Sequence, residues 1–327
     1  MSRGIVRRRS TVTRDRCSIR PWQPVGPVPT SAKVGGRRLI DERTEGIALV
    51  LFTACSWGLT WPQSKFLLSM LPPFTMRATG GFLGCGFAFI VALLRRERVW
   101  PPADQWPRLL VFSMLNYGLF IALGTETLVY LKASEAVVII YTLPVWASLL
   151  AWPMLGERPT ALKIVALVLA LGGVTLLVGA DSAEASWQKL PGAVTGVAAA
   201  ILFGLGTVLA KQKPLRLPPT AAVAWQGVLG LTPVALLACF EHPDFSRVTA
   251  GGWASVAYIS TIPMTAAYLT WFRALRFVSA STASTTVLLS PVVGVIGSGV
   301  LLGETFGARQ IVALSMTLAG VALAAKS

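Results

Sequence analysis

The polar residues of this sequence form no arrangement that would carry out catalysis. A single histidine, His242, rules out a zinc-binding HExxH motif, and no GxxxxGKS/T loop is present to hold a nucleotide phosphate. No aspartate lies within an apolar stretch, so a pair of intramembrane acids is also absent. We therefore expect no enzyme activity, no catalytic residue, no metal site and no cofactor. The residues that remain are suited to binding a solute within long apolar stretches.

Two prolines, Pro144 and Pro291, stand near the centres of such stretches. Because proline has no N–H, Pro144 cannot donate to the Ile140 carbonyl, and Pro291 cannot donate to that of Val287. An unmet polar group in hydrocarbon costs several kcal/mol. Each freed carbonyl is therefore expected to face a cavity or a joint between helices. A kink without any role in binding is the alternative interpretation.

Hydroxyl, amide and aromatic groups supply further candidates for a binding site. Helical spacing places Tyr141 on the same face as Pro144, and Asn116 lies on a polar stripe of the preceding stretch. Near the pseudo-two-fold axis, such groups could hydrogen-bond a polar solute inside an otherwise apolar pocket. Aromatic side chains could form its wall, with packing in the core or toward lipid as the alternative. The aromatic candidates are Trp57, Phe203, Trp225 and Tyr258.

Glu126 is the only acid well inside an apolar stretch. A carboxylate at the centre of a span costs about 2.5–3.5 kcal/mol. Glu126 lies roughly 10 Å from the centre, which lowers that cost. Three interpretations stay open: contact with a substrate or a proton, an ion pair with Lys132 or Arg77, and solvation at the membrane interface.

The composition is that of a membrane protein. The chain has 327 residues, of which 54% are hydrophobic and 13% are charged, and its mean hydropathy is +0.64. A soluble domain carries about 25% charged residues. A bilayer removes the need for a polar surface because hydrocarbon surrounds most of the protein.

The net charge of +15 is concentrated at the N-terminus and between apolar stretches. Eleven of the 29 Lys and Arg fall in residues 1–43. This distribution orients a membrane protein and differs from a basic face interleaved with aromatic residues, so no nucleic-acid partner is expected. Residues 1–43 contain no apolar core, and we interpret them as a basic, disordered cytosolic tail.

Ten apolar stretches are long enough to be transmembrane helices. Strands are excluded because the apolar residues continue without alternation. The stretches run over residues 46–68, 73–94, 108–131, 134–155, 160–179, 190–212, 220–240, 252–275, 279–302 and 307–325. With the N-terminus inside, 23 basic residues fall on the cytoplasmic side and six fall outside or at outer helix ends. The positive-inside rule thus predicts both termini in the cytoplasm, with the chain in the plasma (inner) membrane.

An internal repeat relates the two halves of the chain. Residues 133–178 align with residues 280–325 at an offset of 147 without a gap, and 17 of the 46 aligned positions are identical. Trp57-Gly58 aligns with Phe203-Gly204 at an offset of 146. Because each half has five stretches, an odd number, the second half must enter the membrane from the opposite side. The sequence therefore predicts an all-α membrane protein of two inverted five-helix repeats, over residues 46–179 and 190–325, around a central cavity.

The repeats carry motifs that resemble those of EamA-domain proteins of the drug/metabolite transporter superfamily. The stretch ASEAVVIIYTLPVWASLLAWPMLGERPT resembles that family's end-of-repeat signature, and SASTASTTVLLSPVVGVIGSGVLLGETFGARQ resembles it more closely. The opening SWGLTWPQSKFLLSMLPPFTMRATGGF resembles the family's first two helices. The basic tail departs from the usual pattern of the family. Glu135 departs from it too, because small or basic residues are commoner at that position, so the family pattern does not predict which solute charge is preferred at that end of the cavity.

The resemblance implies a ten-helix bundle that exports amino acids, their derivatives, or other metabolites and drugs. An importer or an uncoupled facilitator is the alternative within transport, and a non-transporting scaffold or receptor is the alternative from another class. A duplicated half with prolines at midspan favours transport. The expected partners are the lipid bilayer and a small-molecule substrate, and homodimer formation stays open.

The predicted orientation can be tested by cysteine labelling. With Glu97→Cys and Glu184→Cys introduced one at a time, a membrane-impermeant thiol reagent added to intact cells should label position 184 and should not label position 97. The opposite pattern would contradict ten spans with both termini inside.

Overall fold

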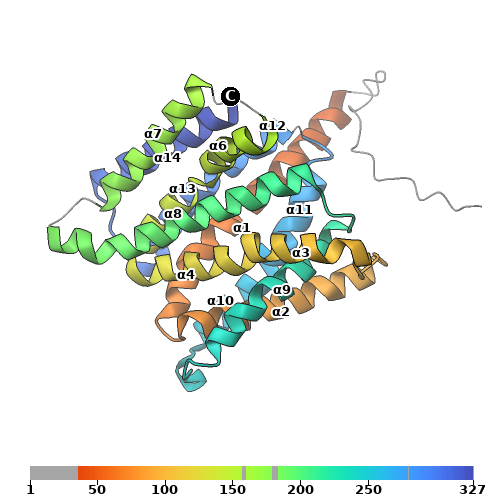
Figure 1. Cartoon of the computed structure of the whole chain (residues 1–327), viewed down its shortest axis with the longest axis horizontal. Coiled ribbons are helices and arrows are strands. Elements are labelled where there is room, and N and C mark those ends of the chain that lie inside the picture. The colour runs from red at the N-terminus through yellow and green to blue at the C-terminus, as the bar shows by residue number, and fades with distance from the viewer. Residues whose placement is uncertain (1–35, 157–159, 179–182, 279, 327) are drawn as a thin grey trace, which may run out of the picture. The chain divides into compact units, whose positions relative to one another are not determined.

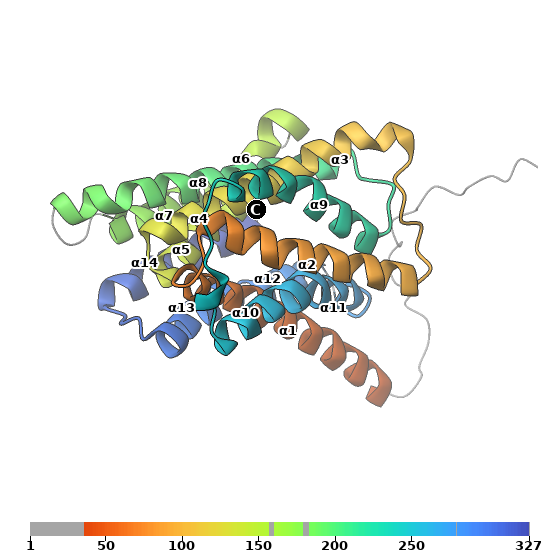
Figure 2. The ribbon, with the colours of Figure 1, turned by 90° about the horizontal axis from the view of Figure 1, so that it is seen from below.

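The structure is a computed structural model that describes residues 36–156, 160–178, 183–278 and 280–326. Within those residues every regular element is helical and no strand occurs (Figures 1 and 2). The expectation of an all-α chain is confirmed for this part of the sequence.

The helices follow the predicted apolar stretches closely. The first half contains α1 (Gly36–Leu68), α2 (Pro73–Leu94), the short η1 (Ala103–Gln105), α3 (Trp106–Ser113), the π-helix η2 (Met114–Leu119), α4 (Phe120–Tyr130), α5 (Ala133–Ile140), α6 (Leu143–Leu155) and α7 (Ala161–Val178). The second half contains α8 (Ala183–Gln212), α9 (Pro219–Ala238), the short η3 (Phe245–Arg247), α10 (Ala250–Thr261), the π-helix η4 (Ile262–Ala266), α11 (Ala267–Ala274), α12 (Ala280–Val287), α13 (Leu289–Leu302) and α14 (Ala308–Lys326). Each predicted stretch coincides with one helix or with helices joined in series.

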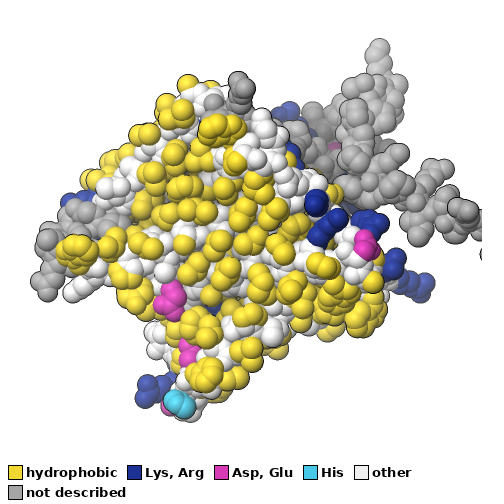
Figure 3. Space-filling model, viewed as in Figure 1, with side chains coloured by type: hydrophobic (Ala, Val, Ile, Leu, Met, Phe, Trp, Pro, Cys, Tyr) yellow, Lys and Arg dark blue, Asp and Glu magenta, His cyan; other side chains and the backbone are white. Residues whose placement is uncertain are grey.

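Several helices have the length and the surface of membrane spans. Five segments are long and apolar enough to cross a membrane by length and composition, namely Pro73–Leu94, Ala103–Tyr130, Ala133–Leu155, Trp187–Gln212 and Pro219–Ala238. Many large apolar side chains are exposed on the outside, such as Leu94 and Val300. Figure 3 shows one face on which hydrophobic side chains cover most of the area while Lys and Arg gather toward its edges. Exposing such an apolar surface to water would cost free energy, whereas contact with lipid does not.

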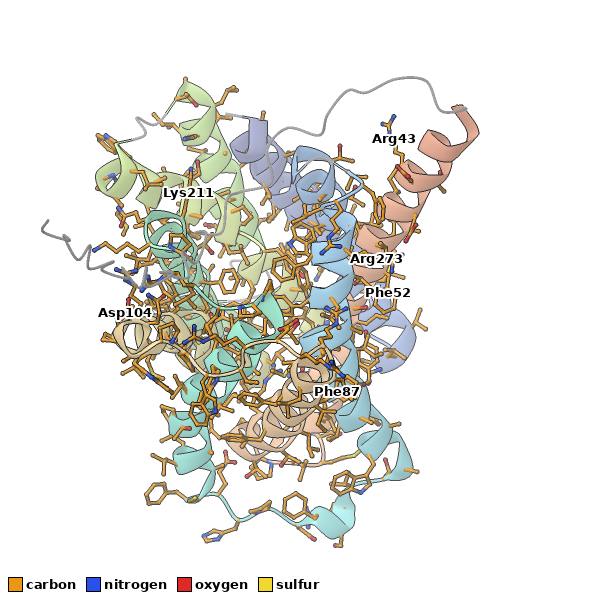
Figure 4. The ribbon with its side chains drawn as sticks, turned by 90° about the vertical axis from the view of Figure 1, so that its right-hand side faces the viewer. Arg43, Phe52, Phe87, Asp104, Lys211 and Arg273 are labelled. Atoms are coloured by element: carbon orange, nitrogen blue, oxygen red, sulfur yellow. The ribbon has the colours of Figure 1, made fainter. Side chains whose placement is uncertain are left out.

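The first helix begins earlier than the sequence predicts. Residues 1–35 of the expected tail lie outside the described residues, and residues 36–43 belong to α1. The helix continues past the apolar stretch because polar residues form the backbone hydrogen bonds of a helix as apolar residues do. On α11, Arg273 donates to Glu45 of α1 through Nε at 3.0 Å, and Figure 4 shows Arg273 beside that helix.

The helices of the two halves pack in pairs that the repeat relates. The most extensively packed pairs are α7 with α14, α2 with α9, and α1 with α13, and α6 packs similarly on α8. At the α7–α14 interface, an added Cβ on Gly173 would lie 2.9 Å from the Ala313 carbonyl oxygen, and one on Gly320 would lie 2.7 Å from that of Ala166. The offset of 147 exchanges these two contacts. Such reciprocity is what a two-fold relation between surfaces produces.

Helix α5 lies at the centre of the packed helices. All eight of its residues are buried, and it contacts α13, α8 and α1. The acidic Glu135 on this helix is 1% exposed and pairs with Lys189 of α8 at 2.9 Å. The acid noted in the sequence is therefore neutralised within the protein.

Carboxylates of the second half cap two helices of the first half. Glu304, after α13, accepts hydrogen bonds from the Ala133 and Ser134 amides at 2.8 and 3.1 Å and from the Ser134 hydroxyl. Glu241, after α9, accepts bonds from the amides of Phe74 and Thr75 at 3.0 and 2.7 Å. The first amides of a helix have no partner within the helix, so these carboxylates satisfy groups that lipid cannot.

Replacing Glu304 by alanine should lower the stability of the folded chain. Hydrogen bonds to a charged group contribute about 1.5–3 kcal/mol, so we expect a loss of about 2 kcal/mol and a clearly lower Tm for the full chain in detergent. Asp244→Ala is the matched control, because that exposed carboxylate accepts bonds only within its own turn. Equal Tm values for the two variants would contradict a role for Glu304 in joining the halves.

Candidate functional site

A cavity of about 520 Å³ lies among helices from both halves of the chain. Its walls come from α1, α2, η2, α4, α8, α9, α10, η4, α11, α14 and the α5–α6 and α12–α13 junctions. Most lining side chains are apolar or aromatic, and the hydroxyl, amide or charged groups among them belong to Thr60, Arg77, Asn116, Tyr117, Tyr141 and Tyr268. This size and this lining suit a small organic molecule.

Two interrupted helices meet at the cavity, and they are interrupted at equivalent positions. Helix α5 ends at Ile140 and α6 begins at Leu143, while α12 ends at Val287 and α13 begins at Leu289. The prediction that the two prolines break the helical hydrogen-bond ladder is confirmed. On each side, the residue whose carbonyl the proline cannot reach, Ile140 or Val287, lines the cavity. Both interruptions thus adjoin the cavity, where irregular backbone is tolerated inside a membrane protein.

The two π-helices also occupy equivalent positions and line the same cavity. Residues 114–119 and 262–266 differ by 147 or 148, within one residue of the repeat offset. Asn116 and Tyr117 of η2 line the cavity, as do their counterparts Pro263 and Met264 of η4. Single π-turns within α-helices occur frequently at functional sites. The sequence gives no signal for the π-turn in η2.

The Trp-Gly and Phe-Gly pairs of the repeat bring the first helix of each half close to its neighbour. An added Cβ at Gly58 would lie 2.4 Å from the Ser290 carbonyl oxygen, and one at Gly204 would lie 2.9 Å from the Ala147 amide nitrogen. Glycine is therefore needed at both positions. The preceding residues, Trp57 and Phe203, line the cavity from opposite halves.

Aromatic contacts fix these two side chains. Trp57 donates its indole N–H to the Pro263 carbonyl at 3.2 Å and lies 5.4 Å from the Tyr268 ring centroid. Phe203 packs on Phe120 with the centroids 4.8 Å apart. Aromatic pairs at these distances contribute to stability beyond the area they bury. The side chains of Trp57 and Phe203 are therefore held in position by the protein itself.

Arg77 is the only charged side chain that lines the cavity among the described residues. It lies on α2, and its Nε donates to the Thr125 hydroxyl at 2.7 Å. The distribution of charge predicts Arg77 among the six basic residues that lie outside or at outer helix ends. Its place one turn inside an apolar helix, just after the Pro72-Pro73 joint, is the signal that would have identified it.

The structure brings together five of the predicted site residues and leaves four elsewhere. Those that line the cavity are Trp57, Asn116, Tyr141, Pro144 and Phe203. The expectation that Tyr141 and Pro291 line one cavity is met by Tyr141 alone. Pro291 is buried beside the tight contact of Ser290 with Gly58, so it faces neither the cavity nor lipid.

Trp225 and Tyr258 do not line the cavity, contrary to the prediction, because their side chains pack and hydrogen-bond elsewhere. Trp225 donates to the Val99 carbonyl at 2.8 Å and packs in an aromatic cluster with Phe89, Trp100 and Trp106. The cavity wall next to Tyr258 is formed by Ile259 instead. Tyr258 donates its hydroxyl to the Ser56 carbonyl at 3.0 Å.

Glu126 also lies outside the cavity lining, because the π-turn changes which face points inward. The predicted stripe assumes regular spacing from Asn116, whereas a π-turn needs an extra residue per turn. The lining continues through Phe120 and Gly124 instead. No ion pair joins Glu126 to Arg77 or Lys132 in the described part of the chain, so that interpretation is wrong.

The internal repeat could have predicted several further lining residues, because the side of a helix that faces the cavity in one half should face it in the other half too. The offset of 147 relates Ile121 to Tyr268 and Gly124 to Trp271, and all four line the cavity. Among the described residues there is also no cluster of His, Cys, Asp or Glu that could hold a metal ion. The arrangement as a whole is suited to enclosing an organic solute.

Comparisons with known proteins also point to transporters. The family model of the EamA-like transporter family matches residues 44–179 and residues 190–325. An uncharacterized transporter of Bacillus subtilis (strain 168), YvbV, is 26% identical over 283 residues, which cover 86% of this chain and 92% of that protein. An uncharacterized transporter of Archaeoglobus fulgidus is 26% identical over 281 residues, which cover 84% and 96% of the two chains.

Two further similarities are more limited, the first in the length that it covers and the second in sequence identity. A probable terminal-alkyne amino-acid exporter of Streptantibioticus cattleyicolor is 28% identical over 199 residues, which cover 60% of this chain and 65% of that protein. A solved crystal structure superposes with a TM-score of 0.61 at 20% sequence identity, covering 85% of this chain and 96% of that chain. That likeness shows the fold alone.

Replacing Tyr141 by phenylalanine should weaken solute binding without affecting folding. The change removes one hydroxyl from the cavity and keeps the ring, and a lost hydrogen bond to a neutral group weakens binding about two- to tenfold. The KM for a transported solute should rise by that factor while the Tm stays unchanged. An unaltered KM would mean that this hydroxyl does not contact the solute.

Proposed function

Because the chain belongs to the EamA-like transporter family, we propose that it is a secondary transporter that exports small organic metabolites such as amino acids or drug-like compounds. A multi-pass membrane protein with one large apolar cavity between its halves is suited to this task. The name of the exporter from Streptantibioticus cattleyicolor supports amino-acid-like solutes and the direction of export.

The proposed mechanism is alternating access by two inverted five-helix repeats, over residues 46–179 and 190–325. The observation that carries it is the cavity, to which equivalent positions of the two halves contribute interrupted helices and π-turns. Solute sites of inverted-repeat transporters lie at the repeat interface and are formed by discontinuous helices. A scaffold or receptor has no need for a solute-sized cavity at that place.

The ion pairs support the proposed course of the chain, with both termini in the cytoplasm of a plasma (inner) membrane protein. Asp104 pairs with Arg216, and both are predicted on the cytoplasmic side. Lys189 pairs with Glu135, and both are predicted on the outer side. An error in the number of spans between partners would separate them across the bilayer.

Filling part of the cavity should slow transport strongly, and Gly80→Leu is suited to test this. Gly80 lines the cavity, and an added Cβ there would meet Ile259 of the cavity wall and Ser260 only at ordinary distances of 3.7 Å or more, so a side chain can begin there without a clash. Competition with the solute should weaken its binding and slow export by about tenfold, which corresponds to about 1.4 kcal/mol. The measurement is an untargeted comparison of metabolites in medium and cytosol of cells with and without the protein.

Gly86→Leu is the matched control, because Gly86 lies on the same helix with nothing within 4 Å of an added Cβ. Cells with the natural chain or this control should accumulate one or more solutes in the medium, and cells with Gly80→Leu should accumulate much less of them. Enrichment in the cytosol instead would indicate an importer. No difference between cells with and without the protein would rule out transport under those conditions and favour a scaffold.

A further inference from the structure

We propose that the solutes of this cavity carry a carboxylate on a small apolar or aromatic body and that Arg77 binds that carboxylate. This inference rests on the proposed transport function and names its substrate class. It is carried by the partners of Arg77, by the charges around the cavity and by the nature of the remaining wall.

The guanidinium of Arg77 is held in place and left open at one end. Its Nε–H donates to the Thr125 hydroxyl at 2.7 Å, and Thr125 is 0% exposed and donates in turn to the Ile121 carbonyl at 2.7 Å. The two terminal amino groups of Arg77 make no hydrogen bond to any described residue and are not among the buried unsatisfied atoms. Two parallel N–H groups at the end of a fixed guanidinium match the two oxygens of a carboxylate.

No acid within the cavity neutralises this cation. Among the described lining residues there is no aspartate or glutamate, and Glu126, next to Thr125, forms no ion pair with Arg77. Charged side chains within spans almost always pair with another group or face a water-filled cavity. Arg77 faces the cavity, so an anionic solute would supply the missing counter-charge.

The charges of the cavity also exclude other classes of solute. An organic cation would be repelled by Arg77 and would find no carboxylate to accept it. A phosphate ester or a dicarboxylate would need a second cation, and no other Lys or Arg of the described residues lines the cavity; Lys65 of α1, for example, donates to the Leu128 carbonyl. One cation in an apolar and aromatic wall fits one carboxylate on an apolar body.

Matched carboxylates and amides test the inference on the full chain in lipid nanodiscs. The pairs are 3-phenylpropionate with 3-phenylpropanamide, hexanoate with hexanamide, and L-phenylalanine with L-phenylalaninamide, each measured by equilibrium binding of the radiolabelled compound. The natural chain should bind at least one carboxylate about tenfold or more tightly than its amide, since hydrogen bonds between charged groups exceed neutral ones. The third pair separates amino acids from simple acids.

Variants assign the preference to Arg77. In Arg77→Gln the carboxylate-to-amide affinity ratio should fall to about one, and Arg77→Lys should retain part of it because the charge remains without the fork. Thr125→Val should lower the ratio by releasing Nε, as expected for a positioning residue. The control is Arg95→Gln, an exposed arginine at the end of the same helix, which should leave the ratio unchanged.

The inference is overturned if the natural chain prefers no carboxylate in any of the three pairs, or if Arg77→Gln retains the preference. Should Arg77→Gln fail to fold, the natural chain and Thr125→Val still decide the outcome. Export that persists without a carboxylate preference would refute the assignment of Arg77 and leave the transport function intact. Absence of export in the metabolite comparison would refute the transport function itself.

Discussion

A backbone amide or carbonyl without a hydrogen-bond partner cannot face lipid, and this constraint determines where helices of this chain can end or break. Helices α2 and α5 begin against carboxylates from the other half, Glu241 and Glu304, which accept their first free amides. The interruptions before Pro144 and Pro291 adjoin the cavity, which Ile140 and Val287 line. The cavity therefore lies where irregular backbone is tolerated.

The same contacts join the two halves, so the architecture depends on their pairing. Contacts at Gly173 and Gly320 are exchanged by the repeat offset, and Gly58 and Gly204 make equivalent close contacts with Gly294 and Ala147. A half taken alone would expose these glycine surfaces and would leave the first turns of α2 and α5 uncapped. Stability and the shape of the cavity thus have a common source in the interface between the repeats.

Much of the fold could be predicted from the sequence because apolar length and proline position act locally. The ends of α2 and the breaks at Pro144 and Pro291 required only hydropathy and the missing N–H of proline. The inward face of a helix was harder to predict, because a π-turn at residues 114–119 shifts it and the sequence of that turn contains no proline or glycine pair that would reveal it. Glu126 was misplaced for this reason, and Arg77 was missed because basic residues near helix ends usually indicate orientation.

The two interrupted helices, α5 and α12, differ in burial although the repeat relates them. All of α5 is buried, whereas Thr282, Thr286 and Val287 of α12 are only half-buried. Among the described side chains of α12 only Ala283 is fully buried, so the two equivalent helices lie in different surroundings. The sequences agree, because α5 is rich in Val and Ile while α12 is rich in Ser and Thr. In the proposed alternating access, a movement of α5 away from the other helices would break the hydrogen bonds that Glu304 accepts at its first turn. The same movement would expose Glu135 and Lys189, which water can hydrate as ions.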